Sequence, residues 1–177
     1  MRRRLTKDAL RDLMKEIARS APRGGTYRVF LLGGGTAVLE GWRESTIDVD
    51  LHADDSRVFE DVQGIKKRAG ANIEFVRPED FVPPLEGSQS RHLFIETVET
   101  VSFYHYDPYA QLLSKIVRGF DRDLRDARRL VDSGMVGVDL FRTLVDGIPE
   151  AAFAAYPTLS AAAIGEAVDE FLSDSAR

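Results

Sequence analysis

The sequence predicts an α+β fold, in which a mixed β-sheet with flanking helices is followed by a C-terminal helical part. Before residue 107, short β-branched and aromatic runs alternate with helical patterns. After it, only helical patterns remain, and 177 residues suffice to bury a core. We expect a core over residues 1–106 and a helical part over residues 107–177, with room for the two to pack as one unit.

The first elements are a helix, a strand, a short helix and a second strand. Apolar residues at helical spacing predict an amphipathic helix over residues 6–19. The apolar run at residues 27–32 predicts a buried strand, which ends at three consecutive glycines. A short helix is expected over residues 36–40. Strict alternation predicts a half-exposed strand over residues 46–52.

The next patterns predict one more helix and three more strands. The helix is expected over about residues 56–69, because Gly70 supplies a stop signal. A strand over residues 71–76 follows. Residues 92–98 and 100–106 could form a hairpin or two sheet edges.

The C-terminal part begins with a strong helix signal. Asp107 is a good N-cap, and proline follows at the first helical position. The helical pattern then runs to about Val131, with Gly119 as a point of interruption. Two further helices are expected over residues 139–155 and 158–173.

Composition excludes several classes of protein. The chain contains no cysteine, which rules out thiol nucleophiles, Cys-based zinc sites and disulfides, and this suits a reducing cytoplasm. No apolar run approaches the length of a membrane span. The basic start, Met1 to Arg4, is not followed by the apolar stretch of a secretory signal. We therefore expect a cytoplasmic protein with no membrane partner.

The charge is unevenly distributed along the chain. The net charge is −5, yet residues 1–36 carry nine Arg and Lys against three Asp and Glu. Residues 137–177 carry two basic and seven acidic side chains. The basic end could meet phosphates, although the net charge argues mildly against a nucleic-acid partner. Ordinary solvated helix faces are an equally open interpretation.

Two carboxylates on the expected strand 46–52 form the main candidate site. Side chains alternate along a strand, so Asp48 and Asp50 share one face while Val49 points to the other. Residues two apart on a strand are separated by about 7 Å. Such a pair can share divalent cations, and Mg²⁺ prefers one or two carboxylates plus substrate phosphates. Because like charges on one strand face repel each other, a cation explains the pair better than a solvated face does.

The glycines before this strand supply a second candidate feature. A strand that ends in Gly33, Gly34 and Gly35 before a helix allows backbone N–H groups to approach phosphate. Thr36 could add its hydroxyl to the same phosphates. A tight turn is the alternative for the glycines alone. The Rossmann fingerprint is not met, because its third glycine position is Val38, and no P-loop motif is present.

Together these segments resemble a known superfamily. The sequence Gly34-Gly35-Thr36-Ala37, followed by Asp48-Val49-Asp50, resembles the defining motif of the polymerase-β-like nucleotidyltransferases. With Arg43 and Thr46 included, the string is similar to the AbiEii/MenT toxins of type IV toxin–antitoxin systems. Those toxins carry a downstream helical motif with Lys, Arg and a following Asp. The residues that resemble it here are Lys115, Arg118, Asp123 and Asp126.

The resemblance implies an activity and a set of partners. Asp48 and Asp50 would bind a catalytic Mg²⁺, with Mn²⁺ as an alternative, and the glycines and Thr36 would hold the triphosphate of an NTP. Lys115 would act in catalysis, and Arg118 would contact nucleotide or acceptor. The implied reaction transfers an NMP from an NTP to RNA, in several relatives to the 3′ end of tRNA. A cognate antitoxin protein would restrain it.

Many members of the superfamily have a third carboxylate on a later strand. Glu74 is the candidate here, because an acid flanked by apolar residues on a strand projects to one face. Glu96 and Asp126 are rivals, and a surface glutamate is the alternative.

Arg43, Thr46 and Lys115 are further candidates. Arg43 would orient the Asp pair or bind phosphate in a bidentate manner. Thr46 lies two residues before Asp48, so a phosphate attached to it would place negative charge where metal and nucleotide sit, and would inactivate. On one continuous helix, Lys115 falls on a charged side that could equally be a solvated face.

Two other functions remain open at this stage. The same core could transfer nucleotide to a small molecule or to a protein side chain. It could also be a catalytically inactive module that binds nucleotide or RNA. Transfer of label from an NTP into RNA would distinguish an RNA-modifying enzyme from both of these alternatives.

Overall fold

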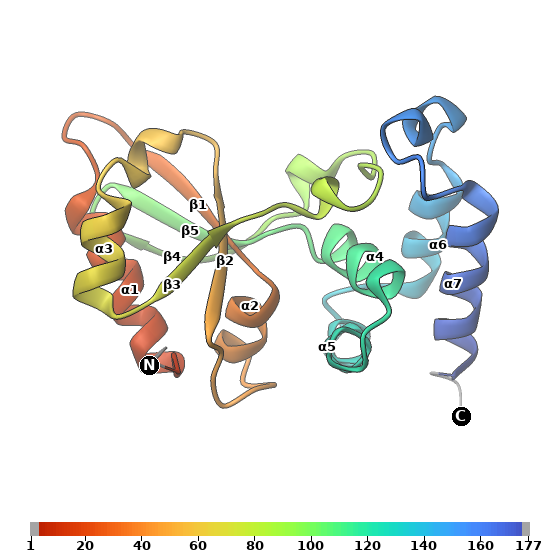
Figure 1. Cartoon of the computed structure of the whole chain (residues 1–177), viewed down its shortest axis with the longest axis horizontal. Coiled ribbons are helices and arrows are strands. Elements are labelled where there is room, and N and C mark those ends of the chain that lie inside the picture. Colours follow the sequence, from red (N-terminus) through yellow and green to blue (C-terminus); the bar gives the residue numbers. More distant parts are fainter. Residues whose placement is uncertain (1–3, 175–177) are drawn as a thin grey trace. The chain divides into compact units, whose positions relative to one another are not determined.

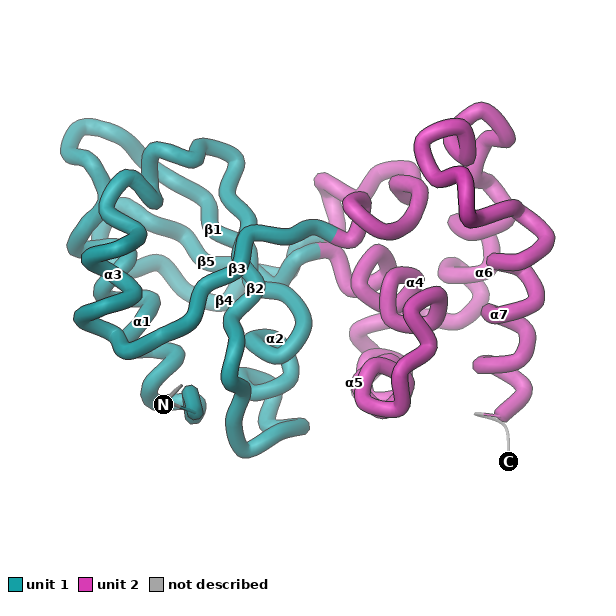
Figure 2. Tube along the Cα trace, viewed as in Figure 1, with its two compact units in different colours: residues 1–77, 92–106 teal, residues 78–91, 107–177 magenta. Residues whose placement is uncertain are grey.

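A computed structural model describes residues 4–174, which fall into two compact units (Figure 1; Figure 2). Unit 1 contains residues 1–77 and 92–106, and unit 2 contains residues 78–91 and 107–177. Residues 78–91 therefore group with the C-terminal helices, although two strands of unit 1 separate them in the chain. Of the basic residues at the start of the sequence, Arg2 and Arg3 lie outside the described residues, whereas Arg4 is described and exposed.

Unit 1 is built on a five-stranded mixed sheet with the strand order β3-β2-β1-β5-β4. Two pairs are parallel, β1 with β5 and β2 with β3, while β1–β2 and β4–β5 are antiparallel. This mixed sheet, with flanking helices and a helical C-terminal part, confirms the predicted α+β fold. The strands are β1 (Tyr27–Leu32), β2 (Asp48–Ala53), β3 (Asn72–Phe75), β4 (Leu93–Val98) and β5 (Val101–His105).

Helices α1 (Lys7–Ser20) and α3 (Val62–Ala69) lie side by side along one face of the sheet (Figure 1). Alternate residues of the strands, such as Val29 and Val49, join Leu13 of α1 in one buried cluster. Because side chains alternate along a strand, the residues between them project to the opposite face. That opposite face therefore carries the polar residues of β2.

The short helix α2 (Gly33–Leu39) follows β1 without a connecting loop and packs beside β2. It begins three residues earlier than expected, so all three glycines fall in its first turn. The expected helix over residues 56–69 is also different, because it is divided into a 3₁₀ turn, η1 (Ser56–Phe59), and α3.

Unit 2 is helical. Asp107 caps α4 as predicted, since its carboxylate accepts a hydrogen bond of 3.0 Å from the Tyr109 N–H. Helix α4 packs against α5 and α7, and α6 packs against α7. The main helices are α4 (Pro108–Arg118), α5 (Asp121–Asp132), α6 (Val138–Asp146) and α7 (Ala161–Asp174).

Two expected helices of unit 2 are each divided. Gly119 adopts φ +68° and ends α4, so the pattern over residues 108–131 forms two helices whose phases are independent. The pattern over residues 139–155 is α6 followed by a 3₁₀ turn, η4 (Glu150–Ala155), because Gly147 closes α6 and Pro149 cannot donate a helical hydrogen bond. Among residues 4–174, no helix has both the length and the hydropathy needed to cross a bilayer.

Candidate active site

The structure places Asp48 and Asp50 on one face of β2, with Val49 between them fully buried on the other. Both carboxylates are partly exposed. Two acids on one strand face repel each other, so this arrangement needs a compensating positive partner.

Strand β3 brings two polar residues beside this pair. In the parallel register, Asp50 lies opposite Glu74 and Asp48 lies opposite Asn72. The Asn72 amide donates hydrogen bonds to Asp48 Oδ1 at 2.7 Å and to Glu74 Oε1 at 3.3 Å. Asn72 was not predicted from the sequence, because its contact with Asp48 depends on the pairing of two strands that lie 24 residues apart.

The expected three-carboxylate metal site, Asp48 and Asp50 with Glu74, stays a prediction. Within residues 4–174, no three or more His, Asp or Glu side chains are arranged to hold a metal ion. Glu74 is exposed, and its carboxylate accepts from the Asn72 amide. Its rival Glu96 lies on β4, three strands away from β2 in the sheet order. The two aspartates are therefore the better supported part of the predicted set.

The glycine turn fits closely against β2 and the segment before it. Gly33 adopts φ +53°, and a Cβ built on it would lie 2.5 Å from Asp50 Oδ2. A Cβ on Gly34 would collide with the Thr46 hydroxyl and lie 3.5 Å from Arg43 Nη1. These two glycines therefore make room for side chains of the site itself, in addition to the backbone approach that we expected for phosphate.

Thr46 holds the start of β2 in place. Its hydroxyl donates to the Asp48 carbonyl oxygen at 2.9 Å, and its backbone exchanges two hydrogen bonds with Leu5, at 2.7 and 3.0 Å. A phosphate on Thr46 would have to displace Gly34, which agrees with the expectation that modification here inactivates.

Thr36 is placed differently from our expectation. Its side chain is buried, and its hydroxyl donates to the Leu31 carbonyl oxygen at 3.2 Å. The same oxygen lies 3.1 Å from His105 Nδ1, and His105 Nε2 lies 2.9 Å from Glu40 Oε1. The hydroxyl that was expected to bind phosphate thus joins α2 to the end of β5 inside unit 1. His105 carried no sequence signal for this role beyond its place on a predicted strand.

Burial lowers the pKa of His105 below its ordinary value of 6.5, while the Glu40 carboxylate opposes that shift. In the unfolded chain the imidazole takes up a proton near pH 6.5, so the unfolded state binds more protons just below that pH. The resulting stability is present above about pH 6.5 and is lost as the pH falls toward the folded pKa.

We therefore expect a His105→Gln variant to show a weaker pH dependence of stability than the parent. The measurement is the midpoint of urea unfolding, monitored by circular dichroism, at a series of pH values between 7.5 and 5.5. His52 and His92 are present in both proteins, so the difference between the two curves isolates His105. Parallel curves would show that another group titrates in this range.

The downstream candidates assemble into one ion-pair cluster in unit 2. Lys115 Nζ lies 3.2 Å from Asp126 Oδ2 and 3.5 Å from Asp123 Oδ1, and Arg118 Nε lies 3.4 Å from Asp123 Oδ2. Lys115 is buried, so the alternative of a solvated charged face does not hold at this residue. The cause is the break at Gly119, which lets α5 turn its aspartates toward α4.

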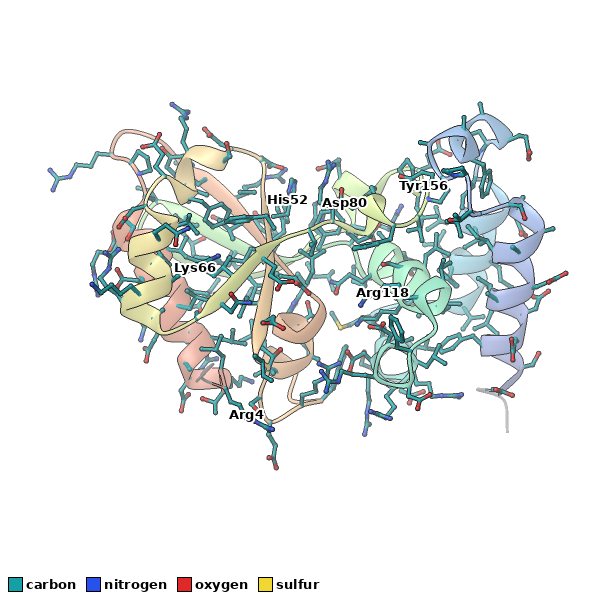
Figure 3. The ribbon with its side chains drawn as sticks, viewed as in Figure 1. Arg4, His52, Lys66, Asp80, Arg118 and Tyr156 are labelled. Atoms are coloured by element: carbon teal, nitrogen blue, oxygen red, sulfur yellow. The ribbon has the colours of Figure 1, made fainter. Side chains whose placement is uncertain are left out.

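One hollow in unit 1 contains none of the predicted residues. It has a volume of about 380 Å³ and lies beyond the Asp pair along β2, between β2, η1 and the end of β3. His52, at its margin, is labelled in Figure 3. The other lining residues are Leu51, Ala53, Ser56, Phe59 and Phe75.

Comparison with known protein families identifies a family for most of the chain. The family described as nucleotidyltransferase of unknown function (DUF6036) matches residues 8–157. No curated protein and no solved structure matches the chain. The matched range includes every candidate residue from Gly34 to Asp126.

Proposed function

Because the chain belongs to the DUF6036 family of nucleotidyltransferases, we propose that it transfers an NMP from an NTP to an RNA acceptor, with the 3′ end of tRNA as target. The observation that carries the proposal is the Asp48/Asp50 pair on one face of β2, fitted against a glycine turn. Family membership supports the nucleotidyl transfer, and the motif resemblance to AbiEii/MenT toxins supports the RNA acceptor.

The donor chemistry of the pair suits a divalent cation. Mg²⁺ is bound by one or two carboxylates plus substrate phosphates and waters, so Asp48 and Asp50 suffice without Glu74. When bound, such a cation would neutralise charge that develops on the phosphates.

The chain's own contribution is position and charge. In the proposed reaction, the acceptor hydroxyl forms a bond to the α-phosphorus while the bond to pyrophosphate breaks. Gly34 and Gly35 lie in the first turn of α2, where N–H groups lack intrahelical partners, and are proposed to bind the triphosphate. The Arg43 guanidinium, beside Gly34, supplies positive charge to the same phosphates.

Lys115 and Arg118 are proposed to act through their positive charges. Lys115 is positioned by the carboxylates of Asp123 and Asp126, and Arg118 by Asp123. We propose Lys115 as a catalytic residue and Arg118 as a contact of the nucleotide or acceptor. A toxin restrained by an antitoxin in the cytoplasm is the biological role that the motif resemblance supports.

A transfer assay tests the proposal. The protein is incubated with Mg²⁺, total RNA and each NTP in turn, labelled at the α-phosphate. We expect label to enter RNA with one preferred NTP, whereas NTP labelled at the γ-phosphate should leave RNA unlabelled. Label that enters only a protein or a small molecule would replace the RNA acceptor. Nucleotide binding without any transfer would identify an inactive binding module.

A further inference from the structure

Helix α5 presents a face of three arginines. Arg122, Arg125 and Arg129 recur at the i, i+3, i+7 spacing of one helical face, and all three are exposed. None of the three forms an ion pair within residues 4–174. The three side chains of this set, which we call the α5 arginine face, are therefore available to an anionic partner.

None of the four acids of α5 pairs with this face within residues 4–174: Asp121 and Asp132 are exposed and form no ion pair with it. Asp123 and Asp126 are buried and pair with Lys115 and Arg118 of α4, so they do not neutralise the arginines. Like charges three and four residues apart on a helix are mutually unfavourable. The cluster is also unusual in a chain whose net charge is −5. An anionic partner would relieve this repulsion.

Two exposed aromatic rings lie at the N-terminal end of α5. The Arg118 guanidinium lies 5.5 Å from the ring centroid of Phe81 and 5.8 Å from that of Phe120. The two side chains are 43% and 64% exposed. Figure 3 labels Arg118 at the end of α4, directly before the turn into α5. Exposed aromatic rings beside arginine are the usual platform for stacking unpaired bases.

We infer that the α5 arginine face, together with Phe81, Arg118 and Phe120, binds single-stranded RNA. The three arginines span seven residues, or about 10 Å at 1.5 Å per residue. That length matches about three phosphates of a stacked strand, at about 3.4 Å per nucleotide. An acidic protein would satisfy the arginines but would leave the rings unused, so RNA fits the whole surface better. The inference rests on the proposed function for the acceptor, which would be the RNA bound here.

The test measures binding without catalysis. Fluorescence anisotropy of a labelled single-stranded RNA oligonucleotide is followed with the full-length protein, without NTP, between 50 and 200 mM salt. We compare the parent with Arg122→Gln/Arg125→Gln/Arg129→Gln. If each arginine contacts one phosphate, the log–log salt slope should become shallower by about 2, since each contact contributes about 0.7. A fall in affinity of at least about tenfold at low salt is expected with it.

A matched control removes the same charge elsewhere. Arg11, Arg23 and Lys67 are exposed residues of unit 1, and changing all three to Gln alters the net charge equally. The control should bind RNA like the parent, and the conservative triple change of the α5 arginines to Lys should retain most of the affinity. Equal losses in the Gln triple and the control would overturn the inference.

The aromatic half of the surface is tested separately. Phe81→Ala and Phe120→Ala should each weaken binding of single-stranded RNA by about tenfold, with little effect on duplex RNA, whose bases are already stacked. Equal effects on both RNAs, or equally tight arginine-dependent binding of polyglutamate, would overturn the assignment.

The outcome is separable from that of the transfer assay. If the protein labels RNA but the α5 substitutions leave its RNA affinity unchanged, this surface is rejected and the proposed function still holds. If RNA binding depends on the α5 arginines but RNA is not labelled, the surface is supported and the proposed transfer to RNA is rejected.

Discussion

Replacing both Asp48 and Asp50 by Asn is expected to lower kcat for NMP transfer by on the order of 10³. A cation held by the pair, as proposed, would contribute several kcal/mol of transition-state stabilisation, and each 1.36 kcal/mol corresponds to a factor of ten in rate. The change removes both charges but keeps an oxygen at each position, so Asn72 can still donate to residue 48. The measurement is a single-turnover rate with α-labelled NTP and saturating RNA.

A structural cause can be separated from a catalytic one by stability. Asn at both positions removes a like-charge repulsion on β2, so the melting temperature should stay the same or rise. Glu74→Gln is the matched comparison, because Glu74 lies opposite Asp50 on the same sheet face but is exposed, and the described residues form no group of three metal-ligating side chains. It should retain most of its activity. Transfer that survives in the double variant would show that β2 does not hold the catalytic centre.

Local patterns predicted most elements of the fold. The period-2 alternation of β2 and the apolar run of β1 depend on burial of one or both strand faces, and both strands appear within two residues of expectation. The Asp107 cap also depends only on neighbouring residues. The strand order depends on long-range pairing instead, so the position of β1 between β2 and β5 had no local signature. The interruption at Gly119 was named from the sequence, whereas the end of α6 at Gly147 was not.

The candidate site, too, could be predicted from the sequence only where it depends on local geometry. That Asp48 and Asp50 share a face follows from strand geometry alone. The roles of Asn72, Thr36 and His105 follow from tertiary contacts between β2 and β3 and between α2 and β5. Burial of Lys115 likewise depended on how α5 packs against α4, which a single continuous helix would not have allowed.

The largest expected loss of stability comes from Arg91→Ala in unit 2. Asp107 is fully buried, and its carboxylate accepts from Arg91 at 2.8 Å from Nη2 and 3.2 Å from Nε. Arg91 Nη1 also donates to the Glu86 carbonyl oxygen at 2.6 Å. Removing the guanidinium breaks an ion pair of a buried carboxylate, and the loss of one partner from a buried pair typically costs about 3–5 kcal/mol. Urea denaturation followed by circular dichroism measures the free energy of unfolding.

The exposed pair Arg142–Asp169, also in unit 2, is the matched control for this prediction. Its N–O distance of 2.7 Å is as short, but the two side chains are 46% and 66% exposed. Water screens such a pair, so Arg142→Ala should cost only about 0–1 kcal/mol. Burial, and not distance, is therefore what makes Arg91 the costlier loss. A cost for Arg91→Ala as small as that for Arg142→Ala would mean that water reaches Asp107 readily, and that the α4 cap holds without its arginine.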